Sequence, residues 1–338
     1  MTAIETFGTT AAGETVHRIR IAGGGLTAHI MTWGAVVQDL RLEGHAPPLV
    51  LGFRHFDDYP AHSPYFGAMA GRYANRIRDG RFRIGDRLHQ VDTNFLGRHL
   101  LHGGARGTGK RVWALADQGP SHVALRLYDR DGDMGFPGNL DVTCVYRLTD
   151  QAALAIEVTG VTDAPTLCNF AHHSYFNLDD GGAGSVGQHR LTIAADAYLP
   201  VDDELIPTGE IAPVAGTPFD FRVPRTVRGD GTVDHDHNWC LAPARRAVAF
   251  AARLEGARSG LSMEVHTSEP GLQFYAGHKV ARPVPGLDGI AYGANAGLCL
   301  EPQVWPDSPN HADFPQALLL PGQVYRQDTS YRFSASSA

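Results

Sequence analysis

Apolar and polar residues alternate along much of the chain, and this period of two constrains the fold more than any other feature of the sequence. Apolar side chains occupy every second position in residues 123–127, 142–148, 154–158 and 261–265. Successive side chains of an extended strand point to opposite faces, so each of these segments is predicted to be a strand with one buried face. Strands of this kind are typical of antiparallel sheets.

Turn signals separate the predicted strands, and long helices are not indicated. Asp131-Gly132, Asp180-Gly181-Gly182 and Gly229-Asp230-Gly231 are typical of tight turns, and glycine is abundant, with 39 residues in 338. Residues 245–255 are the best candidate for a helix, but their apolar positions also alternate, so both interpretations stay open. The sequence therefore predicts an all-β fold, a sandwich or barrel with few short helices.

The chain shows no internal division. No Ser/Pro-rich or charged linker interrupts it, and no repeat with a period of roughly 20 to 50 residues is present. A β sandwich can be larger than the usual domain, so 338 residues are compatible with one unit. A single domain over residues 1–338 is the predicted organisation.

Charge and cysteine usage narrow the class of protein. A net charge of −7, from 29 basic and 36 acidic residues, argues against nucleic acid or an anionic membrane as the main partner. The four cysteines are far apart and form no CxxC pair, so free, mostly buried thiols are expected. The N-terminal residues lack a signal-peptide pattern, and no apolar run approaches the roughly 18 residues of a membrane span, which predicts a cytoplasmic protein.

The segment 169–178, NFAHHSYFNL, combines two adjacent histidines with a hydroxyl, an amide and aromatic rings. In an extended segment His172 and His173 point to opposite faces and cannot both enter one pocket. One of them is predicted to be functional and the other to support it. The alternative is a structural pair satisfied by backbone partners.

Two stretches further upstream place polar groups where a plain core would have none. GRYANRI, residues 71–77, brings Asn75 and Arg76 together, and this pair offers several N–H donors beside one carbonyl acceptor. LLHGG, residues 100–104, places His102 before two glycines that allow close approach of the backbone to a ligand. A surface arginine and a turn histidine without a role are the alternatives.

Two downstream stretches carry an acid and an amide. HDHNW, residues 235–239, holds Asp236 between two imidazoles, and HxH on a strand could present two zinc ligands on one face. No third ligand is evident in the sequence, so a metal site is not predicted. PGLQFY, residues 270–275, supplies Gln273 with aromatic neighbours.

Glu301 lies in GLCLEPQVWPDSPN, residues 297–310, directly after three apolar residues and before a proline. This pattern predicts a strand that carries the carboxylate out of the core into a cleft. Desolvation there raises the pKa of a carboxyl group, which suits a general base. A structural carboxylate at a sheet edge is the alternative.

Common catalytic templates are missing from the chain. It contains no GxSxG, no HExxH, no GxxxxGK[ST] and no GxGxxG between a strand and a helix. The groups that remain are amides, an arginine, carboxylates, imidazoles and aromatic rings. This inventory indicates a neutral ligand rich in hydroxyl groups, whose C–H faces the aromatic rings can cover.

Six of these stretches, taken in order, resemble the aldose 1-epimerase family, also called galactose mutarotases. They extend from residue 71 to residue 310 and are GRYANRI, LLHGG, NFAHHSYFNL, DHNW, PGLQFYAG and GLCLEPQVWPDSPN. The resemblance implies a large antiparallel β-sandwich of the galactose mutarotase type. It also implies an isomerase that interconverts the α and β anomers of aldoses such as galactose or glucose, without metal or organic cofactor.

The resemblance also implies roles for individual residues. Glu301 is the general base and His173 the general acid, and His102 assists at the pocket. The residues implied to bind sugar hydroxyls are Asn75, Arg76, Asp236 and Gln273. One position departs from the family, which usually has Asn where this chain has His172, and this departure makes the sugar preference less certain.

Alternatives to this function come from three classes. A sugar-binding module of the same fold would lack the acid and the base. A glycosidase would use two carboxyl groups, and Asp236 with Glu301 could imitate them, but the imidazole would then have no role. A hexose-6-phosphate 1-epimerase would need further cations, for which Arg72 and Lys110 are candidates. The predicted partner is a monosaccharide, and the protein is predicted to be a monomer or a homodimer.

Overall fold

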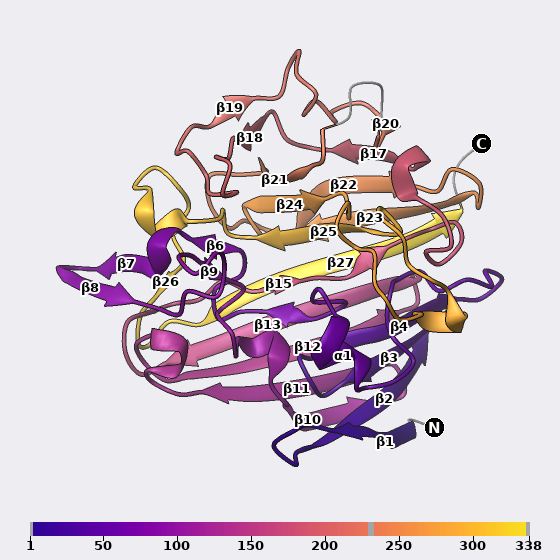
Figure 1. Ribbon diagram of the computed structural model, residues 1–338, viewed down its shortest axis with the longest axis horizontal. Coiled ribbons are helices and arrows are strands. Elements are labelled where there is room, and N and C mark those ends of the chain that lie inside the picture. The colour runs from indigo at the N-terminus through magenta and orange to yellow at the C-terminus, as the bar shows by residue number, and fades with distance from the viewer. Residues whose placement is uncertain (1–2, 229–232, 336–338) are drawn as a thin grey trace.

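The computed structural model describes residues 3–228 and 233–335, whose regular secondary structure is mainly antiparallel strands (Figure 1). Within these ranges the helices are short: one α-helix, α1 (Asp58–His62), and the 3-10 turns η1 (Arg78–Gly80), η2 (Thr108–Lys110), η3 (Asp133–Gly135), η4 (Val186–Gln188), η5 (Leu287–Gly289) and η6 (Ser308–Asn310). No helix of the described residues is long and apolar enough to cross a membrane. The prediction of an all-β fold with few short helices is confirmed.

A nine-stranded sheet forms one layer. Figure 1 shows most of its strands in their spatial order, from β10 near the bottom of the view to β17 near the top. Apolar side chains alternate along these strands as predicted; in β12 every second residue from Leu140 to Leu148 is buried. In spatial order the strands are β10 (Ala114–Gly119), β11 (His122–Asp129), β12 (Leu140–Thr149), β13 (Ala153–Thr162), β27 (Tyr325–Ala335), β23 (Leu261–Thr267), β22 (Ala249–Glu255), β17 (Arg190–Ile193) and β20 (Arg225–Thr226).

Two smaller sheets and four strand pairs complete the fold. The six-stranded sheet has the order β16 (Tyr175–Phe176), β25 (Leu298–Gln303), β24 (Gly271–Tyr275), β21 (Asp236–Cys240), β18 (Ala197–Leu199) and β19 (Ala212–Pro213). The four-stranded sheet is β1 (Ala3–Thr9), β2 (Thr15–Gly23), β3 (Leu26–Met31) and β4 (Val36–Leu42). The pairs are β5 (Met69–Ala70) with β15 (Ala171–His172), β6 (Arg76–Ile77) with β9 (Leu100–Leu101), β7 (Arg81–Ile84) with β8 (Arg87–Gln90), and β14 (Thr166–Leu167) with β26 (Leu318–Leu319).

The main hydrophobic core joins the three larger sheets. Ile30 of β3, Tyr146 of β12 and Leu300 of β25 are all fully buried in one contiguous cluster. Burial of apolar surface is the dominant favourable term in folding, so this shared core holds the nine-stranded sheet against the other two. The result is the predicted sandwich. That residues 1–338 form one domain stays a prediction.

Residues 245–255, which the sequence left open between helix and strand, contain strand β22. The strand has a bulge, because the register of its pairing with β23 shifts between Phe250 and Ala252. An extra residue at a bulge changes which face the following side chains occupy. Val248 is therefore 46% exposed although Ala252 and Leu254 are fully buried, and this break explains why neither periodicity was clear in the sequence.

The predicted turns and thiols can be compared with the structure directly. Gly132, Gly181 and Gly182 have positive φ angles of 81°, 66° and 99°, as tight turns require. The turn predicted at 229–231 lies outside the described residues. All four cysteines are free and three are buried, which confirms that prediction.

Candidate active site

A cavity of about 230 Å³ opens between the six-stranded sheet and the loops that precede β10. All seven residues predicted from the sequence to act on or bind a sugar line it. The complete lining is Pro64, Tyr65, Asn75, Arg76, Phe95, Leu101, His102, His173, Tyr175, Leu205, Asp236, Gln273, Tyr275, Lys279 and Glu301. Residues far apart in sequence are thus brought to one place, although their roles stay predictions.

The register of the six-stranded sheet sets one wall of the cavity. Glu301 of β25 pairs with Gln273 of β24, and Tyr275 of β24 pairs with Asp236 of β21. Paired residues share a face, and residues two apart on a strand do too, so all four side chains point the same way. The alternate residue Leu300 belongs to the main core on the other face.

Glu301 lies deeper than the sequence predicted. The pattern indicated a strand that leaves the core, but every residue of β25 is buried and Glu301 is only 2% exposed. Strand β25 lies between β16 and β24 rather than at an edge. The carboxyl group reaches the cavity because of the face on which it lies, and not because the strand emerges from the core.

The two adjacent histidines point in opposite directions, as expected. The backbone of His173 is hydrogen-bonded to Gly67 and Ala68, and its ring lines the cavity. The His172 ring packs against Tyr146 and Tyr331 of the nine-stranded sheet, with centroid distances of 6.0 and 5.8 Å. Neither ring nitrogen of His172 has a hydrogen-bond partner among the described residues. The His172 ring therefore lies on the core side of this segment.

His102 and Asn75 hold each other in place beside the cavity. The backbone N–H of Asn75 donates to His102 Nδ1 at 3.2 Å, and the backbone N–H of His102 donates to the Asn75 carbonyl at 2.9 Å. Both residues have positive φ, 63° for Asn75 and 50° for His102, a backbone conformation found frequently at functional sites. Because Nδ1 accepts a hydrogen bond, the neutral ring carries its proton on Nε2.

The two glycines after His102 lie against other parts of the chain. The sequence indicated that they allow the backbone to approach a ligand. In the structure the backbone of Gly103, with φ of 80°, lies directly against the Gly71 carbonyl, and a side chain there would overlap that group. Gly103 therefore permits contact between the LLHGG and GRYANRI stretches, whereas Gly104 lies against Asp92 and Met134.

Arg76, Asp236 and Gln273 form a polar network at the cavity wall. Gln273 donates from Nε2 to Asp236 Oδ1 at 2.7 Å, and Asp236 Oδ2 lies 3.5 Å from Arg76 Nη2. Arg76 also donates from Nη1 to Asn75 Oδ1 at 3.2 Å, and its guanidinium lies over the Phe95 ring at 4.7 Å. These contacts fix the arginine without using all of its donors.

Several buried polar atoms of the cavity have no partner. Within the described residues, no group hydrogen-bonds Arg76 Nε, Gln273 Oε1 or Glu301 Oε2. An unsatisfied buried polar group costs roughly 1–3 kcal/mol, so such atoms are uncommon in native proteins without a reason. One donor and two acceptors on residues that line a small cavity match the needs of hydroxyl groups, each of which donates and accepts.

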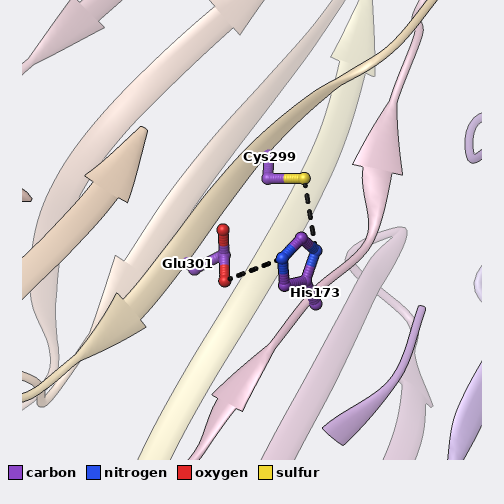
Figure 2. Close-up of side chains that lie close together, drawn as sticks. All are labelled: His173, Cys299 and Glu301. Carbon is purple, nitrogen blue, oxygen red and sulfur yellow. Dashed lines mark hydrogen bonds and ion pairs between the residues drawn. The ribbon is translucent and has the colours of Figure 1, made fainter. Parts of the chain in front are cut away.

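Burial favours the uncharged forms of the two groups predicted to transfer protons. Burial, and then the nearby charge of Asp236, raise the pKa of Glu301 well above its usual value. Burial lowers the pKa of His173 to about 4. Glu301 Oε2 lies 3.5 Å from His173 Nε2 (Figure 2). The pKa of His102 is also well lowered, first by burial and then by His173 and Arg76.

Cys299 is a residue that the sequence analysis did not place at the site. Its Sγ lies 3.5 Å from His173 Nδ1, and Figure 2 shows that it contacts a different ring nitrogen from the one that faces Glu301. The search for CxxC spacing missed it, although Cys299-x-Glu301 on one strand puts both side chains on the same face.

Ligand atoms of His173, Cys299 and Glu301 all lie within 4.8 Å of one another, a spacing that could hold a cation. However, the thiol and the carboxyl group contact different nitrogens of the ring, whereas a single ion would bind only one of them. Among the described residues the HDH sequence takes part in no group of three potential ligands. His235 and His237 instead pack against Phe274 and Phe219, at 5.3 and 4.8 Å.

The sequence analysis also did not assign several aromatic and cationic residues to the cavity. The Tyr65 ring packs against His102 in a tilted arrangement with a centroid distance of 4.6 Å, and Lys110 Nζ lies 4.9 Å from the Tyr65 ring. Tyr275, noted only as a neighbour of Gln273, and Lys279 line the cavity. Tyr65 and Lys279 lie in loops without a distinctive spacing, so no signal in the sequence marked them.

Comparison with known proteins identifies the class of the chain. The sequence model described as aldose 1-epimerase matches residues 17–332. The chain belongs to the aldose 1-epimerase family. It is 40% identical to the galactose mutarotase of Mus musculus over 336 residues, 96% of each chain. It is 36% identical to the aldose 1-epimerase of Escherichia coli over 324 residues, which cover 92% of this chain and 93% of the relative.

Solved structures agree with the assignment to the aldose 1-epimerases. The crystal structure of an aldose epimerase homologue from C. elegans has a TM-score of 0.87 and 31% identity, covering 95% of this chain and 99% of that one. Galactose 1-epimerase from Lactobacillus acidophilus has a TM-score of 0.84 and 27% identity. The family and the fold expected from the six sequence stretches are confirmed. The chain is therefore an isomerase, a mutarotase that acts on a carbohydrate.

Proposed function

We propose that this aldose 1-epimerase interconverts the α and β anomers of a neutral aldose such as galactose or glucose, with Glu301 as general base and His173 as general acid. The observation that carries the proposal is that the Glu301 carboxyl group and the His173 ring lie 3.5 Å apart at one cavity. Other residues that line this cavity have buried polar atoms without a hydrogen-bond partner among the described residues. Asn75, Arg76, Asp236 and Gln273 bind sugar hydroxyls, and His102 assists by donating from Nε2.

The reaction opens the sugar ring, rotates the bond between C1 and C2, and closes the ring on the other face of C1. In opening, Glu301 takes the proton of the C1 hydroxyl, the C1–O5 bond breaks, and His173 gives a proton to O5. Closure reverses these roles. One acid and one base are sufficient, and the enzyme returns to its starting protonation state once the ring has closed.

The two protonation states of the pair fit this cycle. The carboxylate with an imidazolium, and the carboxylic acid with a neutral imidazole, contain the same number of protons. Ring opening converts the first state into the second, and closure converts it back. The pKa directions of Glu301 and His173 favour the second state in the empty cavity. Ring opening by this mechanism therefore requires the charged state to form once a sugar occupies the site.

The surrounding cations favour a neutral sugar over a sugar phosphate. Arg72, a candidate for phosphate binding, is 1% exposed and donates to Asp129 Oδ2 at 2.6 Å and to the Gly138 carbonyl at 2.7 Å. It is a structural residue, and the expectation that it could contribute is wrong. Lys110 and Lys279 are exposed lysines near the cavity. A phosphate dianion usually requires several converging donors, which these two lysines do not form.

Polarimetry tests the proposed function. Freshly dissolved α-D-galactose, α-D-glucose and a pentose are followed with and without the protein, beside galactose 6-phosphate and glucose 6-phosphate. We expect faster mutarotation of at least one neutral aldose and little acceleration of the phosphates. Rates that are unchanged for all sugars would support a binding module, and a clear preference for a 6-phosphate would overturn the choice of substrate.

Metal removal is expected to leave activity unchanged. Proton transfer by Glu301 and His173 needs no Lewis acid, and the Cys299 thiol and the Glu301 carboxyl group face different nitrogens of His173. We therefore expect full mutarotase activity after dialysis against a strong chelator, measured with the same polarimetric assay. A loss of activity that added zinc restores would contradict this prediction.

Replacement of Arg76 should affect binding more than chemistry. The guanidinium contacts Asn75, Asp236 and Phe95 but not Glu301 or His173. A hydrogen bond to a charged group contributes enough that Arg76→Ala should raise KM roughly 10- to 100-fold, with a smaller change in kcat. Initial rates over a range of sugar concentrations separate the two constants. A fall in kcat with unchanged KM would instead place Arg76 in the proton-transfer step.

Assembly and location stay predictions. A monomer or a homodimer, and a cytoplasmic location, are proposed from the sequence alone. Four free cysteines are in keeping with a reducing compartment, since disulfides are rare in the cytosol.

A further inference from the structure

Cys299 is a buried group beside the proposed acid that the mechanism above does not use. Its Sγ faces His173 Nδ1 at 3.5 Å, and Glu301 Oε2 faces Nε2 at the same distance (Figure 2). His173 and Glu301 line the cavity, whereas Cys299 does not. Nε2 therefore faces a carboxyl group that lines the cavity, and Nδ1 faces a thiol on the same face of the sheet that is not part of the cavity lining.

We propose that Cys299 is a positioning residue for His173: its sulfur accepts the Nδ1–H, so that the proton exchanged with the sugar is confined to Nε2. This inference rests on the proposed role of His173 as general acid. In ring opening the Nε2 proton moves to O5 and the Nδ1 proton stays. In closure Nε2 takes the O5 proton back. No bond to sulfur forms or breaks.

The chemistry of an imidazole explains why such a partner matters. A neutral histidine carries its proton on either nitrogen, and the hydrogen bond made by one nitrogen decides the state of the other. If the proton were on Nε2 after ring opening, this nitrogen could not accept the O5 proton during closure. The sulfur, as an acceptor for Nδ1–H, and protonated Glu301, as a donor toward Nε2, together favour the productive form.

The thiol is suited to this role because it stays uncharged. Burial, and then the charge of Glu301, raise the pKa of Cys299 well above its usual value. A thiolate beside Nδ1 would attract the proton strongly and would add a further negative charge near the acidic groups Glu301 and Asp236. A neutral sulfur is a weak acceptor that orients the ring without competing for its proton.

Nitrogen-15 NMR of labelled protein reads the proton on each ring nitrogen directly. The His173 signals are identified by their loss in His173→Asn, and spectra are recorded at the pH of maximal kcat. We expect Nδ1 to have the shift of a protonated nitrogen in the wild type and in Cys299→Ser, whose hydroxyl can also accept. In Cys299→Ala the two tautomers should mix.

Kinetics supply the second measurement. The loss of one neutral hydrogen bond predicts a fall in kcat of about three- to tenfold in Cys299→Ala with KM unchanged, and recovery in Cys299→Ser. The matched control is Cys168→Ala, which removes another buried thiol outside the cavity lining and should leave kcat and the His173 shifts unaltered.

Two results would overturn the proposal. The first is an unprotonated Nδ1 in the wild type, which decides the question even if Cys299→Ala does not fold. The second is unchanged nitrogen shifts in Cys299→Ala, since a lower kcat would then reflect packing alone. Both outcomes leave the proposed function intact, whereas full activity of His173→Asn would remove the function assigned to His173 itself.

Discussion

Glu301→Gln is expected to reduce kcat for mutarotation by roughly 10² to 10⁴, the usual contribution of a general base. The amide has nearly the shape of the carboxyl group but cannot take the proton of the C1 hydroxyl. Gln273 pairs with Glu301 across the sheet and is not altered, so the wall of the cavity should persist. Sugar affinity should therefore remain within about tenfold of the wild type.

Rates come from polarimetry, and affinity comes from sugar binding measured by calorimetry. Glu264→Gln is a matched control, because Glu264 lies on β23 of the nine-stranded sheet and hydrogen-bonds Arg253 and His266 rather than any group of the cavity. It should keep wild-type kcat. Turnover of Glu301→Gln near the wild-type rate would exclude Glu301 as the base.

His173→Asn should have an effect of similar size, roughly 10² to 10⁴ on kcat, because it removes the group proposed to protonate O5. The neighbouring variant His172→Asn is the control and also restores the residue usual in the family. The ring of His172 packs against Tyr146 and Tyr331 on the core side, and neither of its nitrogens has a hydrogen-bond partner among the described residues. The His172→Asn variant should retain most of the activity, because the substitution removes no side-chain hydrogen bond to a described residue.

The same polarimetric assay compares the two variants, with thermal unfolding to check that both are folded. Loss of activity in His172→Asn and its retention in His173→Asn would reverse the assignment of the two rings. A large loss in both, with both folded, would mean that the core contacts of His172 position His173.

Local pattern was sufficient to predict the strands and the orientation of the two histidines. A period of two identified strands such as β12, and opposite faces for His172 and His173 follow from extended geometry alone. The pattern failed at β22, where a bulge breaks the alternation. A bulge depends on pairing with β23, which local sequence does not determine.

The cavity could be predicted only through resemblance to a family. Glu301 and Gln273 meet because β25 and β24 pair in one particular register, a long-range property that no single segment encodes. For the same reason Cys299 was missed, although it lies two residues before Glu301. The wrong expectation for Arg72 arose in the same way, since its partner Asp129 lies on β11, far along the chain.

The register of β21, β24 and β25 also limits how this enzyme can change during evolution. Insertion or deletion of one residue within β25 would exchange the faces of Leu300 and Glu301, which would place a carboxylate in the main core and an apolar side chain at the sugar. A single change of length in this strand would therefore damage both the core and the cavity, and selection would remove it. New sugar preferences can therefore arise by substitution on the cavity face, or by changes of length in segments such as 276–297, which join the strands without entering their ladder.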